Sequence, residues 1–265
     1  MDLELAGKVA IVTGGSQGIG KAVARQLAAE SADVAIAART EDVLRATAVE
    51  LGKETGRRIF PVIVDTGDNS SVRSMVDAVV AEFGRVDVLV NSAAVPGGGG
   101  PTPALESITA EAFWADMNVK VLGYIRCTQA VAPHMKRQGW GRIVNIASTA
   151  ASVGAPTSAA YCASKAGVVG LTRCVALEGA ARGVTCNSIS PGWVETSFGR
   201  DWMGHIAETA EGRARDAYIA ETKASNPQKR LIQPQEIGSL ALWLCRDEAQ
   251  GVTMQDLTVS AGSLW

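Results

Sequence analysis

Near its start the chain reads Val-Ala-Ile-Val-Thr-Gly-Gly-Ser-Gln-Gly-Ile-Gly at residues 9–20. Residues 9–13 form a short apolar run typical of a buried strand, and a helical pattern follows the glycines to about residue 30. A strand, a glycine-rich turn and a helix begin the βαβ unit that binds dinucleotides. Glycines let the main chain approach a pyrophosphate, and the helix N-terminus offers free N–H groups. Taken alone, the turn could also be a tight strand–helix connection without a ligand.

The alternation of strand and helix patterns continues along the whole chain. Apolar runs predict strands over residues 9–13, 34–38, 60–64, 86–91, 142–148, 184–190 and 257–260. Helical patterns cover residues 18–31, 41–55, 69–83, 110–138, 158–182 and 235–246. We therefore expect an α/β, Rossmann-like fold: a doubly wound, seven-stranded parallel sheet with helices on both faces, in a single dinucleotide-binding domain over residues 1–265.

The end of the second strand indicates which dinucleotide is bound. An acidic residue there would accept hydrogen bonds from the ribose of NAD, but this chain has Ala38 followed by Arg39. A guanidinium suits the extra phosphate of NADP. NADP(H) is therefore favoured and NAD(H) remains possible, while the alternative for Arg39 is a solvated side chain at a helix start.

Three residues further along predict carbonyl and alcohol chemistry. Tyr161 and Lys165 are four apart and would share one helix face, and Ser148 ends a strand-like run. An ammonium beside a phenol should lower the pKa of Tyr161, so that it can exchange a proton with an alcohol or ketone oxygen. The Ser148 hydroxyl could polarise the same oxygen. Each residue also has an ordinary explanation, namely a helix cap for Ser148 and a surface pair for Tyr161 and Lys165.

These motifs together resemble those of the short-chain dehydrogenase/reductase family over nearly the whole chain. The resemblance implies a catalytic set of Asn118, Ser148, Tyr161 and Lys165, in which Asn118 would keep a water molecule that links Lys165 to solvent. It implies coenzyme contacts from Gly14, Ser16, Gln17, Gly18, Ile19, Gly20, Arg39, Asp65, Thr66, Asn91, Ala93, Tyr161, Lys165, Pro191, Gly192, Val194 and Thr196. It implies substrate contacts from Ser148, Tyr161 and Trp193. Asp65 could instead cap the helix from residue 69, and Asn118 could be an ordinary residue inside a helix.

Two branches of the family are similar to this chain. The leading expectation is an NADPH-dependent reductase of a 3-oxoacyl or polyketide-like ketone. The alternative is an NAD-dependent dehydrogenase of a small hydroxy acid or cyclic alcohol, such as 3-hydroxybutyrate. A carboxylate substrate would need a cation in the pocket, for which the candidates are Arg200, Lys223, Lys229 and Arg230. A non-catalytic dinucleotide sensor is a remote alternative, because the full catalytic set is present.

The segment 193–230 breaks the alternation of strands and helices. Its apolar residues are interrupted by Gly199, Gly204 and Gly212, which are potential hinges. We expect a substrate lid that closes over the nicotinamide and excludes water, and the alternative is a surface helix pair that serves stability. A second loop, with glycines at 97–100, should lie at the carboxyl end of a strand, where ligands bind in such sheets.

Composition limits the other functions. The formal net charge is -2, and no basic stripe or polybasic tail indicates binding to nucleic acid or a membrane. Five cysteines without a clustered pattern and only two histidines predict free thiols and no metal site. We see no signal segment and expect a cytoplasmic protein. The family resemblance and the terminal pair Leu264-Trp265 predict a homotetramer that acts on a small-molecule ketone or alcohol.

Overall fold

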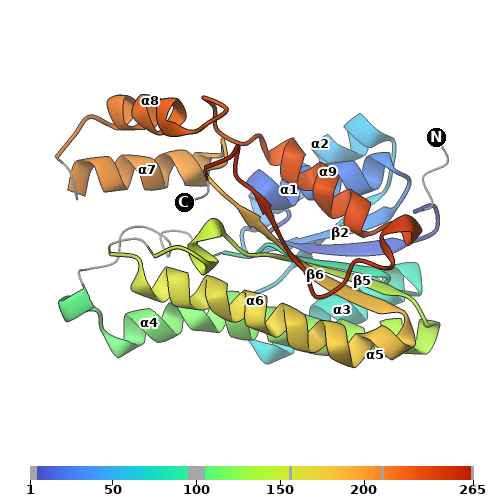
Figure 1. The fold of residues 1–265 in the computed structure, drawn as a ribbon. Coiled ribbons are helices and arrows are strands. Elements are labelled where there is room, and N and C mark those ends of the chain that lie inside the picture. The colour runs from blue at the N-terminus through green and yellow to red at the C-terminus, as the bar shows by residue number, and fades with distance from the viewer. Residues whose placement is uncertain (1–4, 95–104, 155–156, 210–211, 264–265) are drawn as a thin grey trace.

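The computed structural model describes residues 5–94, 105–154, 157–209 and 212–263. Within them, seven strands form one parallel sheet, as predicted (Figure 1). The strands lie in the order β3-β2-β1-β4-β5-β6-β7. The strands are β1 Val9–Thr13, β2 Asp33–Ala38, β3 Ile59–Ile63, β4 Val88–Asn91, β5 Gly141–Ile146, β6 Val184–Pro191 and β7 Asp256–Val259. The α-helices are α1 Gly18–Ala29, α2 Glu41–Thr55, α3 Asn69–Phe83, α4 Ala110–Met117, α5 Gly123–Gln138, α6 Ala159–Gly179, α7 Ser197–Thr209, α8 Arg215–Ser225 and α9 Pro234–Leu244.

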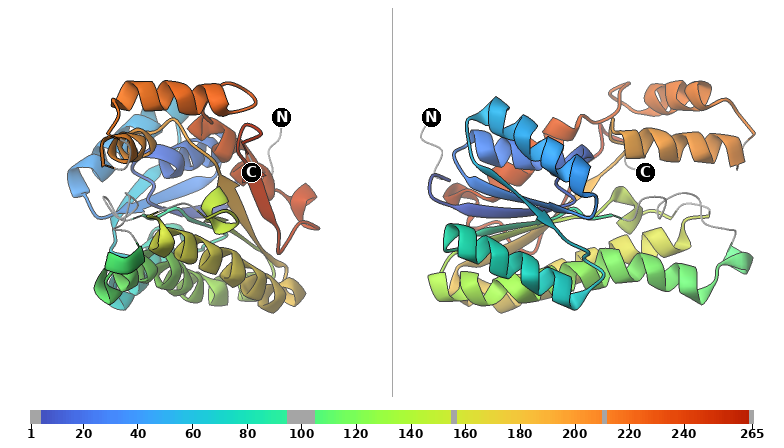
Figure 2. Two further views of the ribbon diagram at one scale, coloured as in Figure 1. Left: turned by 60° about the vertical axis from the view of Figure 1, so that its left-hand side comes forward. Right: turned by 180° about the vertical axis from the view of Figure 1, so that it is seen from behind.

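Helices cover both faces of the sheet, because its strands are apolar on both sides. In β1, Ala10 and Val12 pack towards α1, α2 and α9, whereas Val9 and Ile11 pack towards α3, α5 and α6. Figures 1 and 2 show these two helical layers above and below the sheet. Alternate residues of one strand therefore serve two separate cores, which is the doubly wound arrangement expected from near-continuous apolar runs.

The order of the strands reverses between β1 and β4. The chain moves outward from β1 to β2 and β3, and it then returns to place β4 on the other side of β1. In open parallel sheets the crevice at such a switch point, at the carboxyl ends of the strands, is where ligands bind.

The predicted helix 110–138 is interrupted. Residues Asn118–Leu122 form a π-helical segment between α4 and α5. A π-turn adds one residue to a helical turn, so it changes which side chains face each neighbour. The 3.6-residue pattern used for the prediction cannot detect this insertion, and it has consequences for Asn118 and Lys120.

The segment 193–230 forms two helices, α7 and α8, which extend beyond the carboxyl ends of the strands (Figure 1, left). Two of the three potential hinges serve close packing inside α7 instead. A Cβ added to Gly199 would lie 2.4 Å from the Val194 carbonyl oxygen. A Cβ added to Gly204 would lie 2.9 Å from the Arg215 side chain. Only Gly212, with φ +60°, lies in the connection between the two helices.

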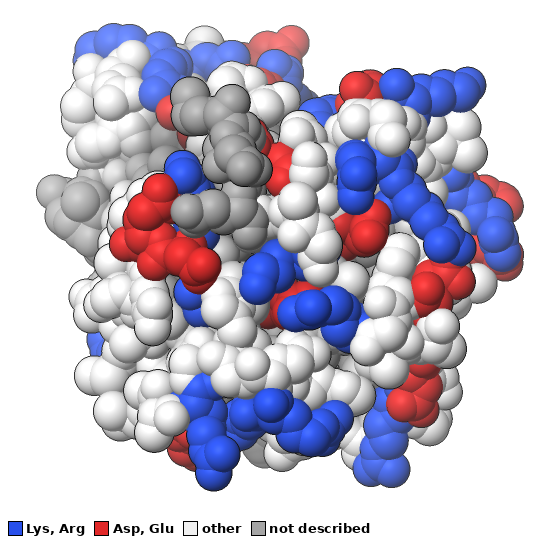
Figure 3. Space-filling view, turned by 90° about the vertical axis from the view of Figure 1, so that its right-hand side faces the viewer, with Lys and Arg blue, Asp and Glu red and all other residues white. Residues whose placement is uncertain are grey.

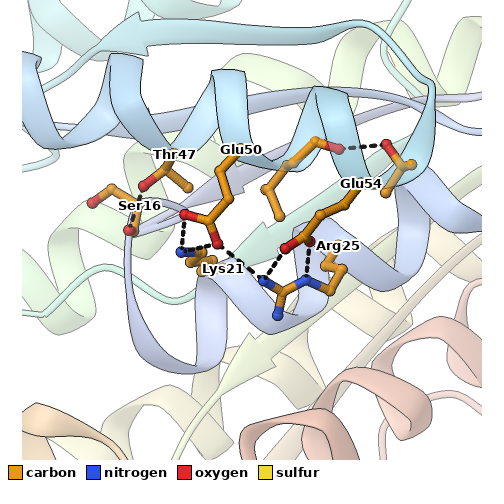
Figure 4. A network of polar contacts seen from close by, with 8 residues as sticks. Ser16, Lys21, Arg25, Thr47, Glu50 and Glu54 are labelled. Carbon is orange, nitrogen blue, oxygen red and sulfur yellow. Dashed lines mark hydrogen bonds and ion pairs between the residues drawn. The ribbon is translucent and has the colours of Figure 1, made fainter.

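A group of ion pairs holds α2 against α1 beside the glycine turn (Figure 4). Lys21 and Arg25 of α1 pair with Glu50, and Arg25 also pairs with Glu54. Thr47 of α2 donates a hydrogen bond to the Ser16 carbonyl oxygen, at 3.0 Å. Because Ser16 belongs to the glycine turn, this contact fixes α2 relative to the predicted phosphate site.

On the face shown in Figure 3, basic and acidic side chains are interspersed, and no large area carries one sign. In the described part of the chain, no helix is both long and apolar enough to cross a membrane. The same residues contain no cluster of three metal-ligating side chains, and all five cysteines are free thiols. The glycine run at 97–100 and the pair Leu264-Trp265 lie outside the described residues.

Candidate active site

A cleft of about 780 Å³ opens at the carboxyl ends of the strands, between the glycine turn and helix α7. It therefore lies at the switch point of the sheet. The predicted residues that line it are Gly14, Ser16, Gln17, Gly18, Ile19, Gly20, Arg39, Thr66, Ala93, Ser148, Tyr161, Lys165, Pro191, Gly192, Trp193, Val194 and Thr196.

The glycine turn forms one end of the cleft. An added Cβ on Gly20 would lie 2.3 Å from the Gly14 carbonyl oxygen, so the turn can close only without a side chain there. Helix α1 begins at Gly18 with no side-chain cap from Gln17 and no acidic residue in its first turn. Its first N–H groups are thus left for an external acceptor, and their partial positive charge suits a phosphate. These residues fit the pyrophosphate of a dinucleotide.

The opposite wall of this end comes from the carboxyl end of β6. A Cβ added to Gly18 would lie 3.4 Å from Cγ2 of Thr196. The glycine turn and the Thr196 side chain are therefore close enough that a single methyl group would bring them into van der Waals contact. Thr196 also accepts a hydrogen bond from the Gly199 N–H, at 2.9 Å, which starts α7 from this wall. The Pro191–Thr196 segment therefore faces the glycine turn across the cleft, where the family resemblance requires it.

Arg39 lies at the rim, directly after β2. Its side chain is exposed and lines the cleft, and it forms no ion pair with any described residue. Its guanidinium is therefore available to an anionic ligand, while the neighbouring Ala38 supplies no carboxylate.

Ser148, Tyr161 and Lys165 meet further along the cleft. Strand β5 ends at Ile146, two residues earlier than predicted, because the chain turns at Ser148 into a 3₁₀ turn, η3 Thr149–Ala151. The Ser148 hydroxyl accepts a hydrogen bond from the Ala150 N–H, at 3.2 Å, and is also hydrogen-bonded to Tyr161. Ser148 thus caps the turn, which was one of the two interpretations of the sequence, and it is also a partner of the phenol; its contact with a substrate oxygen stays a prediction.

Lys165 lies one turn after Tyr161 on α6, as the spacing predicts. Its Nζ donates a hydrogen bond to the Ile146 carbonyl oxygen, at 2.8 Å, and lies 5.8 Å from the centroid of the Tyr161 ring. The lysine is therefore anchored to the end of β5 and close to the phenol.

The predicted pKa shift of Tyr161 is wrong for the protein without coenzyme. Although part of the side chain stays exposed, burial raises the pKa of the Tyr161 phenol to about 12, and the hydrogen bond with Ser148 offsets only part of this rise. Burial also lowers the pKa of Lys165 to about 7, helped by the charge of Lys120. The prediction considered the lysine charge alone, but desolvation disfavours both charged forms.

Aromatic side chains from the 193–230 segment cover Tyr161. The Trp202 ring of α7 meets the Tyr161 ring edge to face, with centroids 4.6 Å apart, and it also contacts Trp193 and Phe198 in this way. The buried Nε1–H of Trp202 has no acceptor among the described residues. Helix α7 therefore gives the cleft an apolar wall beside Tyr161, with the Trp202 Nε1–H as an available hydrogen-bond donor.

Three predicted residues do not line the cleft in the described structure. Asp65 is exposed and accepts a hydrogen bond from the Gly67 N–H, at 2.8 Å, whereas Asp68 caps α3. Asn91 is buried in the sheet and donates to Asn145 at 2.9 Å. Their roles in coenzyme binding stay predictions.

Asn118 does not line the cleft and bonds residues outside the group formed by Ser148, Tyr161 and Lys165. Its Oδ1 accepts a hydrogen bond from Arg126 at 2.8 Å, and its Nδ2 lies 3.4 Å from the Gly67 carbonyl oxygen. From the π-helical segment, Val119 and Lys120 line the cleft. The predicted role of Asn118 in catalysis is not tested by this geometry.

Lys120 and Trp202 lie beside Tyr161 in the cleft, and the sequence analysis did not predict them as site residues. A lysine within an amphipathic helix is usually solvated, so its type gave no signal. The one available sign was Asp116, four residues before Lys120, because opposite charges at this spacing pair on a helix. Trp202 lay in a segment whose structure the sequence did not determine.

Comparison with known proteins identifies the family. A family model described as enoyl-(acyl carrier protein) reductase matches residues 14–263. The chain is 38% identical over 262 residues to D-threitol dehydrogenase of Mycolicibacterium smegmatis, covering 98% of this chain and 94% of that protein. It is 33% identical to the 3-oxoacyl-[acyl-carrier-protein] reductase of Thermotoga maritima, covering 98% and 99%.

Among solved structures, a variant of actinorhodin polyketide ketoreductase with NADPH superimposes with a TM-score of 0.92. The two chains are 36% identical, and the match covers 99% of this chain and 98% of that one. The chain therefore belongs to the short-chain dehydrogenase/reductase family of NAD(P)-dependent oxidoreductases.

Proposed function

We propose that this protein is an NADPH-dependent reductase that converts a ketone of 3-oxoacyl or polyketide type to a secondary alcohol. The observation that carries the proposal is the convergence of Ser148, Tyr161 and Lys165 in the same cleft as an uncapped, glycine-lined helix start. The similarity to ketoreductases supports the substrate class.

In this mechanism the nicotinamide supplies a hydride to the carbonyl carbon when the coenzyme is bound. Ser148 donates a hydrogen bond to the carbonyl oxygen and keeps it beside Tyr161. Tyr161 transfers its proton to this oxygen as negative charge develops there. A phenol with a raised pKa is protonated at neutral pH, which is the form that reduction requires. Lys165 is held near the ring by the Ile146 carbonyl oxygen and stabilises the phenolate when it is charged.

The hydroxy-acid dehydrogenase is less consistent with the cleft. None of its candidate cations lines the described part of the cleft: Arg200 and Lys223 pair with Glu195, Arg230 pairs with Glu236, and Lys229 bonds the Ala224 carbonyl oxygen. Instead, the wall from α7 is aromatic. A carboxylate against this wall would lose its hydration without gaining a cation from the 193–230 segment.

We propose that helices α7 and α8 form the substrate lid, because they carry this aromatic wall and join the rest of the chain beside the coenzyme site. The homotetramer and the cytoplasmic location stay predictions from the sequence. Sedimentation at micromolar concentration tests the tetramer, and a species with only the mass of one 27.5 kDa chain would contradict it.

The experiment that tests the function follows NADPH and NADH oxidation side by side, with an acetoacetyl thioester and a set of cyclic ketones. We expect turnover with NADPH and a clear preference over NADH. Arg39→Ala should reduce this preference by about tenfold or more, because it removes a charge-assisted contact to the extra phosphate. Arg45→Ala is the matched control, since Arg45 is exposed and pairs with Glu41 of its own helix. Equal use of both coenzymes by the parent protein would contradict the assignment to NADPH.

A further inference from the structure

A second buried lysine lies beneath Tyr161. Lys120 is fully buried and forms an ion pair with Asp116, one turn earlier along the chain. The other carboxylate oxygen of Asp116 accepts a hydrogen bond from Ser164 of α6, at 2.9 Å. Asp116, Lys120 and Ser164 thus connect the α4–α5 region to the helix that carries Tyr161 and Lys165.

The ammonium of Lys120 is closer to the Tyr161 ring than that of Lys165. Its Nζ lies 4.6 Å from the ring centroid, compared with 5.8 Å for Lys165. A cation at this distance over an aromatic ring is attracted by the electrons of the ring face. The attraction becomes stronger when the phenol loses its proton, because the ring then carries negative charge.

Stability alone does not account for this buried pair. Removing two charges from water costs several kcal/mol per ion in typical proteins, and apolar side chains of similar size are often as stable. The π-helical segment that starts at Asn118 is a further unusual feature, and such segments are frequent at functional sites. Here the segment directs Lys120 towards Tyr161, while Asn118 faces Gly67 and Arg126.

We propose that Lys120, held by Asp116, is a positioning residue for Tyr161: its ammonium fixes the ring and stabilises negative charge on the phenol as the proton leaves. This inference rests on the proposed role of Tyr161 as proton donor. The substrate oxygen is contacted by Ser148 and Tyr161, and Lys120 acts only through the ring.

The charges around the ring come from three elements. Asp116 lies on α4, Lys120 lies on the π-helical segment, and Lys165 lies on α6, with the neutral Tyr124 of α5 beside Lys165. Asp116 raises the pKa of Tyr161, and Lys120 lowers the pKa of Lys165. Asp116 also raises the pKa of Lys165, so the two members of the pair act on Lys165 in opposite directions. A test must therefore remove the effect of Asp116 before it measures that of Lys120.

Two matched double variants isolate the charge at position 120. Asp116→Asn/Lys120→Arg retains a cation that stays protonated even when buried, and Asp116→Asn/Lys120→Met carries none. Both lack the buried carboxylate, and circular dichroism with thermal unfolding verifies that each is folded. For ketone reduction, the rate falls at alkaline pH when Tyr161 ionises, so this limb of the pH profile reports the phenol.

We expect the alkaline limb of the Arg variant to lie about one pH unit below that of the Met variant, because a cation this close favours the phenolate. An ultraviolet difference titration of the phenol without coenzyme, assigned with Tyr161→Phe, should show the same order. If the doubles do not fold, Lys120→Gln replaces them, since its neutral amide still bonds Asp116. Its limb and phenol titration should then lie above those of the parent protein.

If folded variants with and without the charge at position 120 had the same alkaline limb and the same phenol titration, the proposal would be overturned. Lys120 would then have only a structural role. A different result would identify a failure of the proposed function. If the parent protein reduced no ketone, the reductase assignment would fail, and if Tyr161→Phe were fully active, the role of Tyr161 as proton donor would fail. In both cases the phenol titration would still show whether the charge of Lys120 acts on Tyr161.

Discussion

The coenzyme end and the substrate end of the cleft are built in different ways. At the coenzyme end, main chain packs against main chain: a Cβ on Gly20 would lie 2.3 Å from the Gly14 carbonyl oxygen. At the substrate end, side chains make the wall, and the Trp202 ring contacts three other aromatic rings. Glycines at fixed spacing can be recognised in a sequence, whereas contacts between side chains from distant segments cannot. The difference also predicts that substitutions at the two ends will affect different kinetic parameters.

Gly20→Ala should have the largest effect among these substitutions. The added methyl group meets the backbone of Gly14 and Gly15, so the turn must open, and overpacking of this kind costs roughly 1–3 kcal/mol. We expect coenzyme affinity to fall by about tenfold or more, measured by fluorescence titration with NADPH.

The matched control is Gly52→Ala in α2, where the nearest atom to the added Cβ is the Arg57 carbonyl oxygen at an ordinary 3.5 Å. This variant should bind NADPH normally and gain about 1 kcal/mol or less in stability, because alanine favours the helix. Normal coenzyme binding by Gly20→Ala would remove the contrast between the two ends.

Trp202→Ala should affect the substrate end selectively. Loss of three edge-to-face contacts opens the wall beside Tyr161, and each such contact contributes about 0.5–1.5 kcal/mol. We expect kcat/KM for ketones to fall by about tenfold or more while the affinity for NADPH stays unchanged. Trp202→Phe keeps an aromatic ring, smaller than the indole, and removes the Nε1–H, so it tests the hydrogen-bond donor while part of the packing is retained.

Trp243→Ala on α9 is the control for Trp202, because its side chain is exposed. Trp243→Ala should leave both kcat/KM for ketones and the affinity for NADPH unchanged. A parallel loss of NADPH affinity in Trp202→Ala would show that the two ends are not independent.

Ala261→Gly should have the smallest effect, and it should be stabilising. Ala261 has φ +54° just after β7, where its carbonyl oxygen accepts a hydrogen bond from the Gln228 N–H after α8. A left-handed conformation costs a residue with a Cβ roughly 1–2 kcal/mol, which glycine avoids. Thermal unfolding should therefore show a higher Tm, whereas Ala46→Gly on the exposed face of α2 should lower it. A lower Tm for Ala261→Gly would contradict this explanation.

Most of the fold could be predicted from the sequence because strands buried on both faces are continuously apolar. Helices α2 and α3 begin and end at the predicted residues, since Gly56 and Gly84 terminate them in the left-handed conformation. The glycine turn and the Tyr161–Lys165 spacing are local patterns, so they could be recognised too. The π-helical segment could not, because it depends on tertiary packing rather than on a repeating pattern.

The parts of the site that were missed depend on contacts between distant segments. Lys120 reaches Tyr161 only because the π-helical segment places it there, and Asp116 pairs with it in the interior. The pKa of Tyr161 likewise depends on burial, for which a spacing of four residues carries no information. Asp65 and Asn91 bond within the protein, at the Gly67 N–H and at Asn145.

The central claim is that Tyr161 delivers the proton in ketone reduction, and turnover with NADPH in Tyr161→Phe tests it most directly. The variant keeps the aromatic ring and its contact with Trp202, so the cleft should stay intact. We predict normal NADPH binding and a loss of about two or more orders of magnitude in kcat, the usual scale for positioned acid catalysis. Turnover close to that of the parent protein, with the same ketone and at the same pH, would contradict the account.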